Sequence, residues 1–104
     1  MSYSKYEMKI LQWAEARQII PNATSQTQLL KTVSELGELA DAIIKGDKPK
    51  IIDGLGDVLV TLIVVAALED LDLTECLASA YEEIKNRRGT LLANGVFVKE
   101  TALS

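Results

Sequence analysis

An almost uninterrupted apolar run at residues 58–68 constrains the fold of this chain most strongly, and Thr61 is its single polar residue. A helix that is apolar on every side is normally buried, so we expect other helices or another subunit to cover this segment. Asp53 and Asp57 lie just ahead of the run, and carboxylates in apolar surroundings need partners. A divalent cation is the simplest partner for several such carboxylates at once.

The spacing of apolar residues predicts four helices and no internal repeat. The first helix is expected at 3–19, because Pro21 follows and cannot continue it. The second is expected at 25–45, where Ser25 and Gln28 form an S-x-x-Q capping box at its start.

The third helix is expected at 49–69 and the fourth at 73–88, with Asp72 as the capping residue of the fourth. Beyond it, the Asn-Gly pair at 94–95 is typical of a turn, and 96–98 is expected to form a short extended segment. Short loops between four helices favour an all-α bundle of helical hairpins.

The chain of 104 residues is long enough for one domain, 1–104, with a C-terminal tail at about 90–104. A core of this size is marginal when it stands alone. The apolar excess of the third helix therefore predicts that the protein self-associates.

Composition excludes several functional classes. Lys and Arg total 11 and Asp and Glu total 15, for a net charge of −4, and no basic stripe indicates nucleic-acid binding. The chain has no histidine and only Cys76, so it offers neither a histidine base nor a cysteine cluster for zinc. No long apolar stretch opens the chain, and 58–68 is shorter than a bilayer requires, so we expect a cytoplasmic protein without a membrane partner.

One candidate site lies on the second predicted helix. Gln28, Lys31, Glu35 and Glu38 share one stripe of that helix at spacings of three and four residues. Taken alone, this stripe is typical of the solvated face of an amphipathic helix.

The third predicted helix favours a ligand site more strongly. Asp53 and Asp57 are four residues apart and share a face. The helix dipole explains an acid in the first turn, which suits Asp53 better than Asp57, about two turns in. Gly54 and Gly56 each weaken a helix by about 1 kcal/mol, so they indicate close approach of either a ligand or another helix.

Together the two helices present four carboxylates across a hairpin. Oxygen ligands of this kind suit Mg²⁺, with Mn²⁺ as a substitute, and Mg²⁺ commonly bridges carboxylates to substrate phosphates. Such a cation polarises phosphoryl oxygens and activates water. In a chain without histidine, a glutamate would act as the general base.

Residues 28–99 resemble the all-α nucleoside triphosphate pyrophosphohydrolases of the MazG-like superfamily, above all the small single-domain members of phages and mobile elements. The resemblance lies in QLLKTVSELGELADAI, IIDGLGDVLVTL and AYEEIKNRRG with the tail NGVFVKE. The family's E-x-x-E motif corresponds to Glu35 and Glu38, and its E-x-x-D motif ends at Asp57. Gly54 occupies the glutamate position of the second motif. The resemblance therefore implies that the neighbouring Asp53 supplies the missing carboxylate.

This resemblance implies a Mg²⁺-dependent hydrolase that converts a (d)NTP to the (d)NMP and pyrophosphate, for sanitation or control of the nucleotide pool. It implies a four-helix MazG-like hairpin bundle that forms dimers or dimers of dimers. Glu35, Glu38 and Asp57 would bind Mg²⁺, with Asp53 as the fourth candidate ligand. A glutamate, Glu38 rather than Glu35, would orient or deprotonate the attacking water.

Several further residues are candidates for substrate binding, each with a structural alternative. Lys31 would contact the triphosphate or pair with Glu35. Basic residues at the end of the fourth helix would reach phosphates or stabilise that helix end. Trp13 would stack on the base, although a tryptophan at this spacing is more often core or interface. The candidates are Gln28, Lys31, Lys85, Asn86, Arg88 and Trp13. The alternative function is a non-catalytic helical protein that binds nucleotide or metal, or that only oligomerises.

Overall fold

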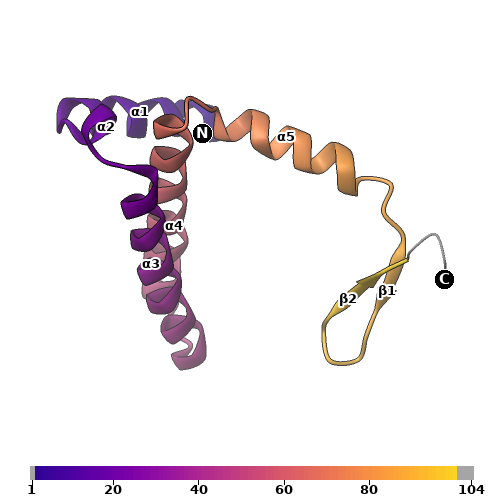
Figure 1. Ribbon diagram of the computed structural model, residues 1–104. Helices are drawn as coiled ribbons and strands as arrows, with labels where there is room; N and C mark the ends of the chain where they lie inside the picture. The colour runs from indigo at the N-terminus through magenta and orange to yellow at the C-terminus, as the bar shows by residue number, and fades with distance from the viewer. Residues whose placement is uncertain (1, 101–104) are drawn as a thin grey trace. The chain divides into compact units, whose positions relative to one another are not determined.

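The computed structural model describes residues 2–100 and is mainly helical, as expected (Figure 1). It divides into two compact units, the first ending at Thr74 and the second beginning at Glu75, and each is described by itself. The first unit contains α1 (Tyr3–Ala16), α2 (Ile19–Asn22), α3 (Ser25–Lys45) and α4 (Lys48–Leu68). Most of the second unit is α5 (Leu73–Ile84) and a two-stranded hairpin.

An antiparallel hairpin of α3 and α4 forms the centre of the first unit, where the two helices lie side by side (Figure 1). Gly46 ends α3 in the left-handed conformation with φ 66°, which glycine adopts without a steric cost. Asp47 then caps α4 by accepting a hydrogen bond from the Lys50 backbone N–H at 3.3 Å. These local signals turn the chain within a few residues, so the two long helices return along each other.

The start of α3 differs from the predicted capping box. Thr24, not Ser25, is the capping residue, and its side chain accepts from the Thr27 N–H at 3.1 Å. Ser25 instead donates its hydroxyl hydrogen to Glu69 Oε1 at 2.6 Å, which links the first residue of α3 to the end of α4. Two adjacent hydroxyl residues carry the same capping signal, and only the extended backbone of Thr24 decides between them.

The first helix is shorter than the expected 3–19. It ends at Ala16, because Gln18 takes a left-handed conformation with φ 61° that no helix continues. Ile20 is extended, as the residue before a proline tends to be, and Pro21 lies inside the short α2.

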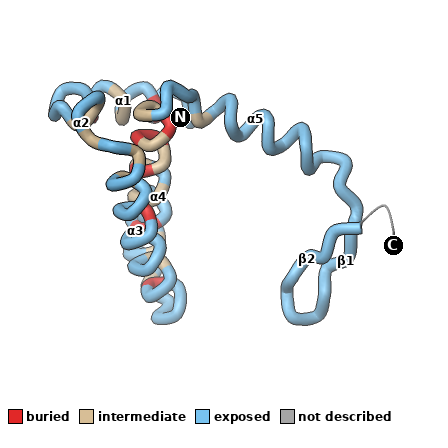
Figure 2. Tube along the Cα trace, in the orientation of Figure 1, coloured by how far each residue is buried: buried red, intermediate tan, exposed pale blue. Residues whose placement is uncertain are grey.

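The core of the first unit lies between α4 and its neighbours, and Figure 2 shows the few buried positions of this unit in red. Val64 is almost completely buried, as are Ile63 and Ala66 on the same helix. Thr61, the polar exception in the apolar run, accepts a hydrogen bond from Thr32 of α3 at 2.8 Å and donates to the Val58 carbonyl. Its hydroxyl is therefore satisfied, which is what a buried polar group requires.

Much of the apolar surface of α3 and α4 stays exposed. By length and composition alone, α4 is the one helix in the described part of the chain that is apolar enough to cross a membrane. The same composition suits the central helix of a larger bundle, and the single chain covers only part of it. The exposed large apolar residues of the two helices are Leu29, Leu30, Val33, Leu36, Ile43, Ile44, Ile52, Leu55 and Leu59.

The second unit carries a β-hairpin that the sequence predicted only in part. Its strands are β1 (Gly89–Leu91) and β2 (Phe97–Lys99), which pair antiparallel with Thr90 opposite Val98. The expected extended segment at 96–98 is thus a paired strand, and β1 was not predicted. The expected turn is confirmed, with Gly95 at φ 87°.

At the boundary of the units, Asp72 accepts from the Thr74 N–H at 2.8 Å, which confirms it as the cap of α5. The helix ends at Ile84 rather than near residue 88. Lys85, Arg87 and Arg88 therefore follow the helix instead of forming its last turn.

Candidate functional site

A cleft of about 360 Å³ runs between α3 and α4, and charged side chains of both helices line it. Three predicted metal ligands meet there, Glu38 from α3 and Asp53 and Asp57 from α4. Each helix contributes residues at spacings of three or four, so one face of each helix forms a wall. The complete lining is Glu38, Asp41, Ala42, Lys45, Lys50, Asp53, Gly54 and Asp57.

Glu35 lies one turn before Glu38 on α3 and is half-buried. Its Oε2 atom is buried and has no hydrogen-bond partner. The pKa of its carboxyl is raised, first by burial and then by the negative charge of Glu38, a hydrogen bond with Glu38 and the charge of Asp57. Lys31 opposes this increase in pKa but does not cancel it. The carboxyl of Glu35 is therefore harder to ionise than that of a solvated glutamate.

This environment fits a cation. An unpartnered carboxylate oxygen in a buried position is costly unless a hydrogen-bond donor or a metal ion meets it. Within residues 2–100, however, no three Asp, Glu or Cys side chains converge closely enough to hold a metal ion by themselves. The residues thus suit a cation such as Mg²⁺, which keeps water and phosphate oxygens among its ligands.

Gly54 has a packing reason that the sequence alone left open. It is buried, and a Cβ built on it would lie 3.2 Å from Leu39 Cδ1 and 3.3 Å from Leu39 Cβ. The glycine therefore lets α4 approach α3 closely at the floor of the cleft. A Cβ built on Gly56 would meet no atom of another element within 4 Å, so close packing does not explain this glycine within the first unit.

The remaining candidates of the first unit lie outside the cleft lining. Lys31 is exposed and acts on Glu35 through its charge, while the Gln28 carbonyl accepts from the Thr32 hydroxyl at 3.1 Å. Trp13 is 40% exposed on α1, and the Arg17 guanidinium lies 5.0 Å from its ring centroid. The ring therefore already has a cationic neighbour and is only partly available for stacking on a nucleobase.

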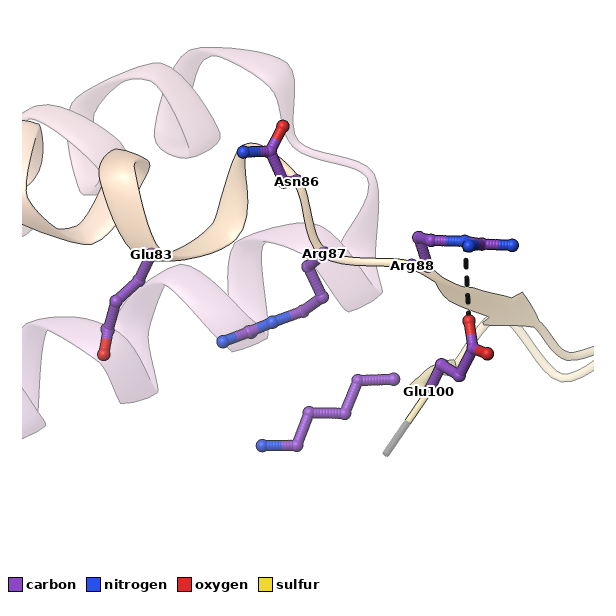
Figure 3. A pocket seen from close by; sticks show the side chains of 6 residues that line it. Glu83, Asn86, Arg87, Arg88 and Glu100 are labelled. Carbon is purple, nitrogen blue, oxygen red and sulfur yellow. Dashed lines mark ion pairs between the residues drawn. The ribbon is translucent and has the colours of Figure 1, made fainter. Parts of the chain in front are cut away.

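The candidates of the second unit surround a separate, open pocket of about 560 Å³ (Figure 3). Asn86 and Arg88 line it, and Arg88 Nε forms an ion pair with Glu100 Oε2 at 3.5 Å. Asn86 and Arg87 point to opposite sides of the backbone in this view. Lys85 does not line the pocket and pairs with Glu82 at 2.6 Å.

Three residues of the α3–α4 cleft, Asp41, Lys45 and Lys50, were not among the sequence candidates. A signal for them was present, because Asp41 and Lys45 continue the stripe of Glu38 at three and seven residues. Lys50 precedes Asp57 by seven residues on the facing helix. Extending both stripes to the ends of the predicted helices would have found all three.

Comparisons with known proteins bear on the family and the fold of this chain. Residues 23–91 match the family model of the MazG nucleotide pyrophosphohydrolase domain. An uncharacterized 18.2 kDa protein of Haemophilus phage HP1, from the rep-hol intergenic region, is 35% identical over 63 residues. The match covers 61% of this chain but 39% of that protein, so the matched part spans about two fifths of its relative.

A solved structure is similar over almost the whole chain. It is the cyanophage S-2L MazG-like pyrophosphohydrolase bound to dGDP and three catalytic Mn²⁺ ions per active site, with a TM-score of 0.68. The alignment covers 97% of this chain and 99% of that one at 20% sequence identity. At this identity the likeness concerns the fold, and it confirms the MazG-like all-α architecture expected from the sequence.

Proposed function

This chain belongs to the MazG nucleotide pyrophosphohydrolase domain family, and from that premise we propose that it hydrolyses nucleoside triphosphates to the monophosphate and pyrophosphate. The reaction takes place in the α3–α4 cleft with Mg²⁺ or Mn²⁺ as cofactor. Its biological setting is the cytoplasm, where it cleans or limits the nucleotide pool. The dGDP and Mn²⁺ of the cyanophage protein support a nucleotide substrate and a divalent cation here.

The single observation that carries this proposal is the state of Glu35. Its buried Oε2 atom has no partner, and burial together with the charges of Glu38 and Asp57 raises the pKa of its carboxyl. A folded protein keeps such an arrangement at a cost to its stability, because like charges repel and a buried oxygen lacks a donor. A bound cation removes both penalties.

Glu35, Glu38 and Asp57 are the proposed ligands, with Asp53 on the cleft wall as the fourth candidate. Because no three of these side chains converge by themselves within residues 2–100, the cation would need water and phosphate oxygens to complete its contacts. Such mixed coordination is usual for Mg²⁺. When bound, the cation polarises the phosphoryl oxygens and makes water a stronger nucleophile. The carboxylates that would hold it would then repel the negatively charged triphosphate less.

The chain's own residues then act on the water and the substrate. Glu38 lines the cleft and is exposed, whereas one oxygen of Glu35 is buried. Glu38 is therefore the better-placed base to accept the proton of the attacking water. Water attack breaks the α–β anhydride bond, and pyrophosphate leaves. Lys31 adds positive charge next to Glu35, and Gln28, Trp13, Lys85, Asn86 and Arg88 remain candidates for holding the rest of the nucleotide.

Self-association belongs to this proposal. Several large apolar side chains of the helical hairpin are exposed, for example Leu30, which is 70% exposed, and Ile44, which is 83% exposed. Exposed apolar surface of this extent is typical of a protein interface. A second copy of the chain, as a dimer or a dimer of dimers, would cover it.

Pyrophosphate release from a panel of canonical and modified NTPs and dNTPs tests the reaction, with Mg²⁺, with Mn²⁺ and with EDTA. We expect release with a divalent cation and none with EDTA. Removing a hydrogen-bond partner behind a metal ligand already costs 10–100-fold, so Glu38→Gln and Asp57→Asn should each lose about 100-fold or more. Glu15→Gln, on an exposed position of α1, is the matched control. Retained turnover in the amide variants of Glu35, Glu38, Asp53 and Asp57 alike would overturn the assignment.

A binding protein without catalysis is the second candidate, and Gly54 favours it because the second acidic motif lacks its first carboxylate. This candidate predicts that NTP and Mg²⁺ raise the melting temperature while no pyrophosphate appears. A purely structural oligomerisation domain predicts no shift at all. The two assays together therefore separate the three functions.

A further inference from the structure

We propose that Lys45 and Lys50 bind the outer phosphates of the substrate, the part that leaves as pyrophosphate. The inference rests on the proposed function and deepens it by assigning the end of the cleft away from Glu38 and Asp57. Both lysines line the same cleft as these carboxylates. They are the only basic residues of that lining.

Helix geometry separates the two ends of the cleft. Lys45 follows Glu38 by seven residues and Lys50 precedes Asp57 by seven, which is roughly 10 Å along each helix axis. Because α3 and α4 are antiparallel and joined at Gly46 and Asp47, both lysines lie at the loop end of the hairpin. The cleft is thus acidic toward its middle and basic at its loop end.

Within residues 2–100, neither lysine forms an ion pair with a neighbouring carboxylate. In the described part of the chain, the side-chain ion pairs are Lys85–Glu82 and Arg88–Glu100, both outside the cleft. Asp41 and Asp53 are one turn away from the lysines but form no such pair with them. The two ammonium groups are therefore available to an anion that enters the cleft.

Local helix stability explains one lysine but not the other. Lys45 lies in the last turn of α3, where the helix dipole favours a positive charge. Lys50 lies in the first turn of α4, where the same dipole disfavours a positive charge. Lys48 lies in the same turn, so the dipole alone does not distinguish these two lysines of α4. Lys50 differs from Lys48 because it lines the cleft, and this is the observation that favours a ligand for it.

The chemistry of a triphosphate matches this division of charge. Carboxylates repel phosphates unless a cation lies between them, so the acidic part of the cleft suits the reacting phosphates with their metal. Lysines attract phosphate oxygens directly and need no cation. The outer phosphates, which carry most charge once the leaving group forms, then lie at the basic end.

Inorganic triphosphate is the probe, because it carries the phosphates without a base or sugar. Isothermal titration calorimetry in Mg²⁺ measures its affinity for the wild type, Lys45→Gln and Lys50→Gln, with orthophosphate as the reference ligand. We expect each variant to bind triphosphate roughly tenfold more weakly. Orthophosphate should be affected less, because a single phosphate in Mg²⁺ is able to stay at the acidic part of the cleft with the metal. Lys48→Gln is the matched control, since Lys48 also starts α4 and is exposed but does not line the cleft. The proposal would be overturned if the variants lose affinity for both ligands equally, or if they lose none. It would also be overturned if Lys48→Gln has the same effect, or if the wild type does not bind triphosphate.

Conservative variants separate charge from folding. Lys45→Arg and Lys50→Arg should restore triphosphate affinity, and failure to do so in folded protein would also overturn the proposal. The titration needs no turnover, so it is independent of the reaction. If no NTP releases pyrophosphate but the glutamine variants lose triphosphate, the lysine assignment stands and the hydrolase proposal fails. If the protein hydrolyses NTPs and the glutamine variants keep their affinity for triphosphate, the hydrolase proposal stands and the lysine assignment fails.

Discussion

Replacing Gly54 and Gly56 by alanine, one at a time, separates close helix packing from helix propensity within a single helix. Both glycines lie in α4, and each alanine gains about 1 kcal/mol of helix propensity. Only at position 54 would the new methyl group meet the facing helix, against Leu39 of α3. The difference between the two variants therefore measures the close approach.

The size of the difference follows from the contacts. Carbon atoms pack best at about 3.5–4.0 Å, whereas a Cβ on Gly54 would lie 3.2 Å from Leu39 Cδ1, 3.3 Å from its Cβ and 3.4 Å from its Cα. Two of these atoms are fixed to the backbone, so α3 itself must move by a few tenths of an ångström. Overpacking of this kind costs about 1–3 kcal/mol. Gly54→Ala should thus be less stable than Gly56→Ala by roughly that amount.

Urea denaturation followed by far-ultraviolet circular dichroism measures the free energy of unfolding of both variants and the wild type. Running each curve at two protein concentrations reveals any contribution from self-association. Gly56→Ala should exceed the wild type by about 1 kcal/mol, a rise of roughly 4–8 °C in melting temperature. Equal stability of the two variants would refute the argument that Gly54 is required for close approach.

The same contact bears on restoring the second acidic motif. Gly54→Glu brings a carboxylate to the cleft, but its Cβ meets Leu39 as alanine does. We therefore expect Gly54→Glu alone to lose about 1–3 kcal/mol of stability. Pairing it with Leu39→Ala removes the nearest contact and is the better test of whether a carboxylate at position 54 increases pyrophosphate release.

Two further predictions concern charge and the hairpin. The pKa of Glu35 is raised in the folded chain above its ordinary 4.5, so the metal-free protein loses stability as the pH rises from about 4.5 through the folded pKa. Glu35→Gln should therefore melt at a higher temperature than the wild type at pH 7 without metal. The difference should shrink as the pH falls below about 4.5 and Glu35 of the wild type becomes protonated, and the variant should lose the stabilisation by Mg²⁺. An unchanged melting temperature at pH 7 would contradict the argument. Gly89→Ala should open the β-hairpin, because its Cβ would collide with the Val98 carbonyl oxygen and the Phe97 ring. Hydrogen exchange at the hydrogen-bonded amides of Leu92 and Glu100 should then accelerate by about tenfold or more, while exchange in the first unit is unaffected. Retained protection of these two amides would contradict the prediction.

Local signals explain what the sequence predicted well. The bounds of α3 and α4 follow from Gly46 and Asp47, each of which acts on its own few residues through a left-handed turn or a cap. The cap of α5 at Asp72 is of the same kind. Such signals need no knowledge of the rest of the fold, which is why they are readable in advance.

The elements that were missed depend on distant partners or on backbone choices without a residue signature. Gly89–Leu91 becomes a strand only because Phe97–Lys99 pairs with it. Gln18 ends α1 in a left-handed conformation, which is uncommon for residues other than glycine. The role of Gly54 was equally hidden, because it is set by Leu39 on the other helix.

The candidate site shows the same division between local and non-local information. Spacing alone placed Glu35 with Glu38 and Asp53 with Asp57, and the structure brings Glu38, Asp53 and Asp57 to one cleft. Spacing did not reveal that a Glu35 oxygen is buried without a partner, since burial is a property of the assembled hairpin. The strongest support for a cation thus came from packing rather than from the motif.

Glu35 and Lys50 each weaken the isolated chain, and each has an explanation in the cleft. Glu35 buries an oxygen without a partner, and Lys50 opposes the dipole of α4. Gly54 differs from them, because the helix propensity that it gives up is offset by the close approach of α4 to α3. A sequence shaped for stability alone would keep Gly54 and remove the other two, whereas the proposed cation and phosphates would relieve both penalties. The stability of this hairpin should therefore depend on its ligands, as binding to the folded state alone requires.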